Sequence, residues 1–187
     1  MLISNEFEVA LPVAQVWEFF GDIPRVAACL PGAELTETKG EDSYAGRVAI
    51  RMGPVRLRFT GIADITERDN DHHRLVVHAS GSDERGRGQA AMVVTATLAP
   101  AGPATRVEVK QDLQLSGAAA QYGRGMISDV SSILMRDFAT AMRRQIEGGP
   151  GVSAAPAQGL TIAFRAAALA LTRVFRRFFL PYEPRST

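Results

Sequence analysis

A period of two in hydrophobicity, running from Ala33 to about Leu115, constrains the fold of this chain more than any other feature. Leu57, Phe59 and Ile65 alternate with polar residues in one stretch, and a second stretch repeats the pattern. Such alternation is typical of antiparallel strands with one buried and one solvated face. Turn signals divide the region into six strands; they are Lys39-Gly40, Gly53-Pro54, Asp69-Asn70-Asp71, Gly86 to Gly88 and Ala101-Gly102-Pro103.

The flanking segments predict one more strand and three helices. "LISNEFEVAL" alternates as a strand, Pro12 opens a short helix in "VAQVWEFFGD", and "DIPRVAACLPG" forms a second one. After Gly117 the period becomes 3.6 and predicts a long helix that ends at Gly148-Gly149-Pro150. We therefore expect an α+β fold, in which a curved antiparallel sheet of about seven strands wraps around a long C-terminal helix.

The C-terminal part of the chain has a different composition. Residues 148–158 are small, polar or proline-rich and predict a flexible linker between a domain at 1–147 and a tail at 159–187. On a helical wheel the tail places apolar side chains in one arc and arginines opposite, which is typical of an interfacial membrane helix. The expected membrane-contact residues are Leu160, Phe164, Arg165, Leu171, Arg173, Phe175, Arg176, Arg177, Phe178 and Phe179.

Charge and cysteine content bear on partners and location. The chain has 187 residues and net charge +1; residues 159–187 carry five arginines and one glutamate, which leaves −3 on residues 1–158. A net acidic domain without aromatic stacking motifs argues against nucleic acid. One cysteine, Cys29, cannot form an internal disulfide, and the N-terminus lacks a signal-peptide pattern. We expect a cytoplasmic protein that the tail brings into contact with a membrane.

Signatures of catalytic chemistry are missing from the sequence. It contains no Cys-x-x-Cys, no His-Glu-x-x-His, no phosphate-binding loop and no serine elbow. His72 and His73 lie in a polar turn, and without a nearby fourth ligand at fixed spacing we predict no metal site. The arginines around Gly53-Pro54 (Arg47, Arg51, Arg56 and Arg58) fit a solvated strand face, with docking to an acidic partner or to anionic lipid as the alternative.

Three stretches point to a family. They are "FEVALPVAQVWEFFGDIPRVAACLPGAEL", "YAGRVAIRMGPVRLRFTGIADITERD" and "LSGAAAQYGRGMISDVSSILMRDFATAM", which contain Pro-Gly, Gly-Pro and Ala-Gln-Tyr-Gly in this order. With these stretches the chain resembles the carbon monoxide dehydrogenase CoxG family over roughly residues 2–146. The order of elements resembles the helix-grip fold of START-like proteins. The resemblance implies a non-catalytic accessory protein of molybdenum-containing carbon monoxide dehydrogenase or a related hydroxylase, held peripherally on the inner face of the cytoplasmic membrane. It also implies an apolar ligand between the sheet and the long helix.

The resemblance and the small residues on both sides of the interior predict a ligand cavity. Pliable methionines and other apolar side chains suit a long, flexible lipid, and we predict a respiratory isoprenoid quinone, menaquinone or ubiquinone, that is carried to the dehydrogenase for reduction. The expected lining comprises Phe20, Leu30, Ile50, Met52, Leu57, Phe59, Met92, Tyr122, Met126, Ile127, Val130, Leu134, Phe138 and Met142. A simple membrane tether, an assembly factor, or a polyketide-cyclase-like enzyme using Tyr122 are the alternatives.

Overall fold

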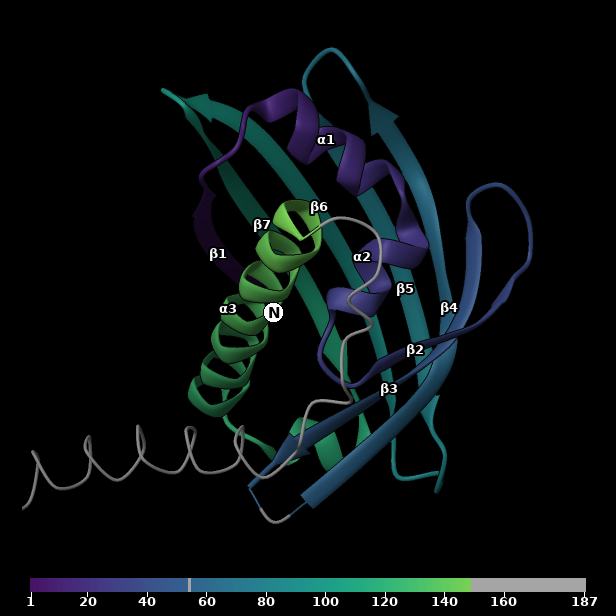
Figure 1. Ribbon diagram of the computed structural model, residues 1–187. Coiled ribbons are helices and arrows are strands. Elements are labelled where there is room, and N and C mark those ends of the chain that lie inside the picture. Colours follow the sequence, from purple (N-terminus) through teal and green to yellow (C-terminus); the bar gives the residue numbers. More distant parts are fainter. Residues whose placement is uncertain (54, 149–187) are drawn as a thin grey trace, which may run out of the picture.

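The computed structural model describes residues 1–53 and 55–148, and the predicted order of elements is confirmed (Figure 1). The chain forms strand β1, two short helices, six further strands, a 3₁₀ turn and one long helix. Their bounds are β1 Leu2–Val9, α1 Val13–Gly21, α2 Ile23–Cys29, β2 Ala33–Thr38, β3 Ser43–Met52, β4 Val55–Asp69, β5 Arg74–Asp83, β6 Gln89–Ala101, β7 Ala104–Leu115, η1 Gly117–Gln121 and α3 Arg124–Glu147.

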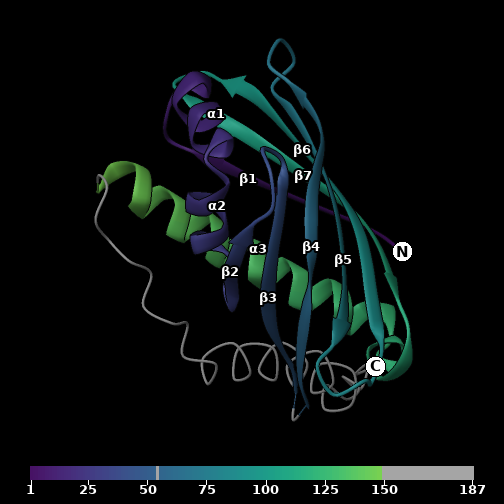
Figure 2. The same ribbon diagram turned by 90° about the vertical axis from the view of Figure 1, so that its right-hand side faces the viewer.

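The seven strands form one sheet in the order β1-β7-β6-β5-β4-β3-β2, and every neighbouring pair is antiparallel. Consecutive strands are neighbours from β2 to β7, and β1 closes the far edge against β7. The sheet curves, and α1, α2 and α3 lie on its concave side, which we call the inner face (Figures 1 and 2). This is the expected α+β architecture of a sheet wrapped around a long helix.

The helix that follows β7 is shorter than its sequence period predicts. The turn η1 occupies Gly117–Gln121, and Tyr122 and Gly123 are extended before α3 begins at Arg124. Gly123 and Gly125 weaken helix formation at this point because glycine loses the most backbone freedom on ordering. The break separates η1 from α3, and η1 and the start of α3 lie at the end of the sheet where the β3–β4 and β5–β6 turns lie (Figure 2).

Apolar side chains on the inner face form two separate clusters. The first, which we call the α1/α2 core, joins α1, α2 and the C-terminal half of α3 to strands β4 to β7. The second, which we call the η1 core, joins η1 and the first half of α3 to the other end of the sheet. The buried members of the α1/α2 core are Val9, Val16, Phe19, Phe20, Cys29, Ile65, Leu75, Ala96, Leu98, Val107, Val109, Phe138 and Met142, and those of the η1 core are Ile3, Leu57, Phe59, Ala119, Ile127 and Val130.

Within residues 1–53 and 55–148, no helix combines the length and the hydrophobicity needed to cross a membrane. The predicted linker at 148–158, apart from Gly148, and the whole predicted tail at 159–187 lie outside the described residues.

Candidate functional site

Small inward-facing residues separate the two cores on the inner face of the sheet. Gly61 pairs with Gly81, which pairs with Ala90, and the adjacent row pairs Ala63 with Ala79. All five are half-buried, whereas the inward residues on either side of them in β4, Phe59 and Ile65, are only 7% and 8% exposed. We call these five the small-residue strip; Ala90 packs against the η1 core, and the other four belong to neither core.

Close approach of the backbones fixes glycine at the centre of the strip. A Cβ atom added to Gly61 would lie 2.0 Å from the carbonyl oxygen of Ser80, far inside van der Waals contact. A Cβ at Gly81 would lie 3.0 Å from the carbonyl oxygen of Thr60. Any larger side chain at Gly61 would force the strands apart, so the strip stays small for a backbone reason as well as a packing one.

A buried polar network fastens α3 to the sheet. The Ser131 hydroxyl donates to Oε1 of Gln111 (3.1 Å), and Asn5 Nδ2 donates to the Ser131 hydroxyl (3.2 Å). Ser132 on the next position of α3 donates to Oδ1 of Asn5 (3.2 Å). Ser131 and Gln111 are 8% and 7% exposed. Buried hydrogen-bonded groups of this kind specify one arrangement because any shift leaves polar atoms unsatisfied.

Gln111 keeps an unused donor within this network. The hydroxyl of Ser131 uses its only hydrogen on Oε1, and Nε2 of Gln111 has no hydrogen-bond partner among the described residues. A primary amide offers two N–H donors. The interior thus combines apolar surfaces with a glutamine side chain whose amide can still donate, and a ligand with carbonyl oxygens could accept from it.

The predicted lining residues divide between the two cores. Phe20, Phe138 and Met142 are buried in the α1/α2 core, with Leu30 packed against it. Leu57, Phe59, Ile127 and Val130 are buried in the η1 core, with Ile50, Tyr122 and Leu134 packed against it. Met92 is half-buried opposite Ala79, Met126 is 44% exposed in the first turn of α3, and the side chain of Met52 is outside the described part. Their contact with a ligand stays a prediction.

The sequence reading missed Gln111, although a signal was available. The alternation in β7 places Val107, Val109, Leu113 and Leu115 on the inner face, and position 111 continues the same register. A glutamine at an inward position of an otherwise apolar series marks a buried polar group that needs a partner. Ser131 carries no comparable mark, because a serine on a long helix is ordinarily solvated.

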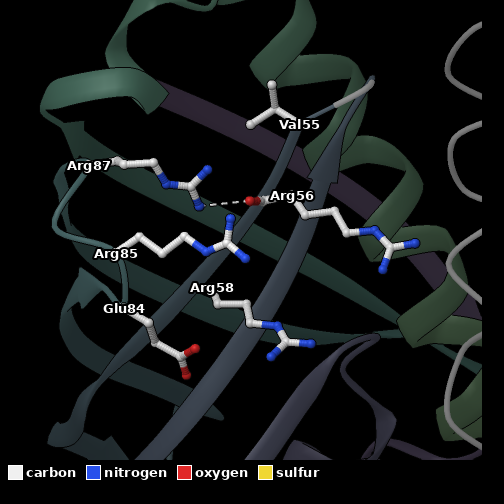
Figure 3. Close-up of a pocket in the computed structure, with 6 residues that line it drawn as sticks. All are labelled: Val55, Arg56, Arg58, Glu84, Arg85 and Arg87. Carbon is white, nitrogen blue, oxygen red and sulfur yellow. Dashed lines mark hydrogen bonds between the residues drawn. The ribbon is translucent and has the colours of Figure 1, made fainter.

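A second feature is a pocket of about 500 Å³ at the end of the sheet near η1, which we call the arginine pocket (Figure 3). It is lined by Val55, Arg56, Arg58, Glu84, Arg85 and Arg87. Arg56 and Arg58 come from β4, and the last three residues come from the β5–β6 turn. Only the two β4 arginines belong to the basic face expected from the sequence. Of the other two, Arg47 pairs with Glu34 at 3.1 Å, and Arg51 also has a partner.

Asp83 holds the β5–β6 turn in place. Its carboxylate accepts two hydrogen bonds from the Arg87 guanidinium, both at 2.8 Å, and further bonds from the backbone N–H groups of Arg58, Arg85 and Arg87. The Arg87 hydrogen bonds, with smaller help from the backbone donors, hold the pKa of Asp83 far below its usual range. Arg87 also donates to the carbonyl oxygen of Arg56 at 2.7 Å, which ties the turn to β4 (Figure 3).

The cysteine and the histidines that the sequence offered as candidates pack or pair with neighbouring side chains. Burial raises the pKa of the Cys29 thiol to about 11, against a smaller opposing effect of Arg25, so this thiol stays protonated inside the α1/α2 core. His72 Nδ1 lies 2.7 Å from Asp69 Oδ2, and the ring of His73 meets Trp17 edge to face. In the part of the chain that the structure describes, no three His, Cys, Asp or Glu side chains form a metal-binding group.

Comparison of folds places this geometry among START-like proteins. A conserved protein from Geobacillus kaustophilus superposes with a TM-score of 0.71 at 21% identity, covering 79% of this chain and 96% of that one. A START superfamily protein from Mycobacterium smegmatis gives a TM-score of 0.54 at 14% identity, covering 79% of this chain and 97% of that one. The Zhui aromatase/cyclase from Streptomyces sp. R1128 gives 0.51 at 14% identity, covering 79% and 92%. At such identities the likeness shows the fold. No curated protein sequence matches significantly.

Family membership rests on the sequence itself. The model of the carbon monoxide dehydrogenase CoxG family matches residues 6–147, about three quarters of the chain and all the strands after the start of β1. The match covers the α1/α2 core, the small-residue strip, the arginine pocket and the buried residues of the η1 core other than Ile3. The chain therefore belongs to the CoxG family of carbon monoxide dehydrogenase and has its START-like, helix-grip architecture.

Proposed function

We propose that the interior between the sheet and α3 binds a respiratory isoprenoid quinone, which the protein delivers to a molybdenum-containing carbon monoxide dehydrogenase or a related hydroxylase for reduction. The observation that carries this proposal is the small-residue strip. Five small, half-buried residues lie between two apolar cores on the face that α3 covers. An isoprenoid chain is long, apolar and flexible, and it suits a space walled by apolar side chains at both ends.

Gln111 supports a quinone in preference to a plain hydrocarbon lipid. A quinone ring carries two carbonyl oxygens, and each can accept a hydrogen bond from an amide N–H group. The Nε2 atom of Gln111 has no partner among the described residues. In this proposal the amide binds one quinone carbonyl while the isoprenoid chain occupies the strip and the neighbouring apolar surfaces.

The family name supplies the redox context of the proposal. Oxidation of carbon monoxide releases two electrons, and a quinone that accepts them with two protons becomes a quinol. Respiratory quinones are confined to the bilayer by their hydrophobic chains. A protein that extracts the quinone and presents it to the dehydrogenase needs no catalytic residue of its own, since the bound quinone is itself the electron acceptor.

Membrane contact is assigned in this proposal to the amphipathic segment 159–187, which lies outside the described residues. Its apolar arc would insert among lipid headgroups at the inner face of the cytoplasmic membrane while its arginines meet anionic lipid, at about 1 kcal/mol per arginine. Deletion of residues 159–187 should greatly weaken binding to anionic vesicles while leaving the unfolding midpoint unchanged. A truncated protein that binds such vesicles as the full chain does would contradict this assignment.

The proposed function is tested by the ligand that the protein carries from its native cells. The full-length protein is purified without detergent and extracted with organic solvent, and the extract is analysed by mass spectrometry. We expect menaquinone or ubiquinone in the extract, and reduction of the bound quinone when the partner dehydrogenase and carbon monoxide are added. An extract free of quinone, with no uptake of added menaquinone or ubiquinone, would reject quinone carriage and leave a tethering role.

A further inference from the structure

The arginine pocket gathers positive charge from two separate segments of the chain. Alternation along β4 sends the side chains of Arg56 and Arg58 to the same, solvated side of the sheet. Arg85 and Arg87 extend from the β5–β6 turn toward that strand (Figure 3). Arg56, Arg58 and Arg85 are exposed, and none of their guanidinium groups has a hydrogen bond or ion pair within the described residues.

The charge balance of the pocket leaves an excess of positive charge. Asp83 neutralises Arg87, and Glu84 supplies one further carboxylate, which also accepts a hydrogen bond from the Thr60 hydroxyl at 3.3 Å. Against three other arginines this gives a local net charge of +2. Like charges held together repel and destabilise the fold, so a site that keeps three unpartnered arginines around one hollow is electrostatically suited to an anion.

Hydrogen bonds fix Arg87 and the backbone segments that carry the other three arginines. The Asp83 carboxylate receives bonds from both the Arg87 side chain and the backbone N–H of Arg85, which sets the start of each side chain. The bond from Arg87 to the carbonyl oxygen of Arg56 connects the turn to β4, and the amide of Ala118 in η1 donates to the carbonyl oxygen of Arg87 at 2.7 Å. The two walls of the pocket are therefore held at a constant separation.

We infer that the arginine pocket is a binding site for a phosphate group. A guanidinium presents paired N–H donors that match two oxygens of a phosphate, and a tetrahedral phosphate can be reached by arginines from both walls at once. A planar carboxylate offers only two oxygens and half the charge of a phosphate monoester, which carries close to −2 at neutral pH. The group has two sources, the headgroup of an anionic phospholipid or a free phosphate compound, and a volume of about 500 Å³ admits either.

The proposal is tested by a double substitution with a charge-matched control. Arg56→Gln and Arg58→Gln together remove two exposed charges from the pocket, and neither side chain has a hydrogen bond or ion pair to lose within the described residues. The control replaces Arg136 and Arg144, two exposed arginines on the later turns of α3, by glutamine. All proteins are full-length, so the contribution of residues 159–187 is the same in each. Equal unfolding midpoints verify that both variants are folded.

Two probes separate the sources of phosphate. Inorganic phosphate and pyrophosphate are titrated by calorimetry, and vesicles of phosphatidylcholine containing phosphatidylglycerol are titrated by co-sedimentation. Each arginine should contribute about fivefold, so the pocket variant should lose about twenty-fivefold in affinity, and the control should lose far less. A loss confined to vesicles supports a lipid headgroup, and a loss that includes inorganic phosphate supports a free phosphate compound.

Three results would overturn the assignment. Equal losses of affinity in the pocket variant and the control would show that binding depends only on the overall charge of the protein. Unchanged affinity of the pocket variant for both probes would show that the pocket binds no phosphate. Competition by polyglutamate at concentrations where pyrophosphate does not bind would assign the pocket to an acidic protein instead. None of these outcomes depends on quinone binding, because no apolar interior residue is altered.

Discussion

The two ends of the inner face both consist of apolar side chains, but different elements cover them. At the α1/α2 core, α1, α2 and α3 all cover the sheet, and the rings of Phe7, Phe20 and Phe138 meet edge to face with centroids 6.2 and 6.3 Å apart. At the η1 core, a 3₁₀ turn and the first half of α3 cover a smaller set of buried side chains, and charged residues line the adjacent turn. One end is sealed by three helices, and the other leaves charged turn residues at the surface.

This contrast assigns different tasks to residues of the same type. An inward alanine in β6, Ala96, is 5% exposed and fills a tight position in the α1/α2 core. An inward alanine in β5, Ala79, is half-buried in the small-residue strip. The sequence alone does not tell these two apart, because the difference lies in which helix lies above each position.

The largest effect is expected from a truncation in the sealed end. Phe138→Ala removes a buried ring from the α1/α2 core and should lower the free energy of unfolding by about 3–5 kcal/mol. Leu134→Ala, one helical turn earlier and only half-buried beside the η1 core, should cost about 1 kcal/mol. Urea unfolding of both variants gives the two values. Equal losses would mean that both ends are packed alike.

Added bulk provides the complementary test. Ala96→Phe should destabilise by about 1–3 kcal/mol because the α1/α2 core has no room for a ring. Ala79→Phe should cost less than about 1 kcal/mol, because the strip is not filled, and should prevent quinone binding. Thermal unfolding and quinone titration of the two variants measure these effects. Should Ala79→Phe be as destabilising as Ala96→Phe, the strip would be ordinary core.

Some elements of the fold could be predicted from the sequence, and others could not. Alternation and turn residues predicted all seven strands and both short helices, because strand period and turn chemistry are local properties. The break at Tyr122 and Gly123 was missed, since a glycine pair weakens a helix without fixing where it begins. The joining of Arg85 and Arg87 to Arg56 and Arg58 was also missed, because it depends on the register of β4 with β5.

The polar network between the two ends gives a smaller expected effect. Gln111→Leu should weaken quinone binding about tenfold, the value of one lost hydrogen bond to a ligand, and should cost about 1 kcal/mol in stability because Ser131 loses its acceptor. Ser131→Ala removes the same network bond and leaves the Gln111 amide in place, so its quinone affinity should stay near that of the unsubstituted protein. Equal losses of affinity in both variants would place Gln111 in a purely structural role.

The smallest expected effect is on stability at acidic pH. The pKa of Asp83 is lowered in the folded protein, chiefly by the Arg87 hydrogen bonds, so this carboxylate stabilises the fold fully above the ordinary carboxyl pKa of about 4 and progressively less as the pH falls below it. Unfolding midpoints measured across that range should decline less steeply for Asp83→Asn, which is already less stable at neutral pH. If the unfolding midpoints of the two proteins declined in parallel with pH, Asp83 would not contribute to the loss of stability in acid.

Titration of the full-length protein with menaquinone and ubiquinone, followed by native mass spectrometry, tests quinone binding in the interior most directly. The unsubstituted protein and Ala96→Phe should each bind one quinone molecule in a saturable manner, and Ala79→Phe should bind none while remaining folded. Quinone binding that Ala79→Phe leaves unchanged would place the ligand away from the small-residue strip, and the absence of binding in the unsubstituted protein would contradict quinone carriage altogether.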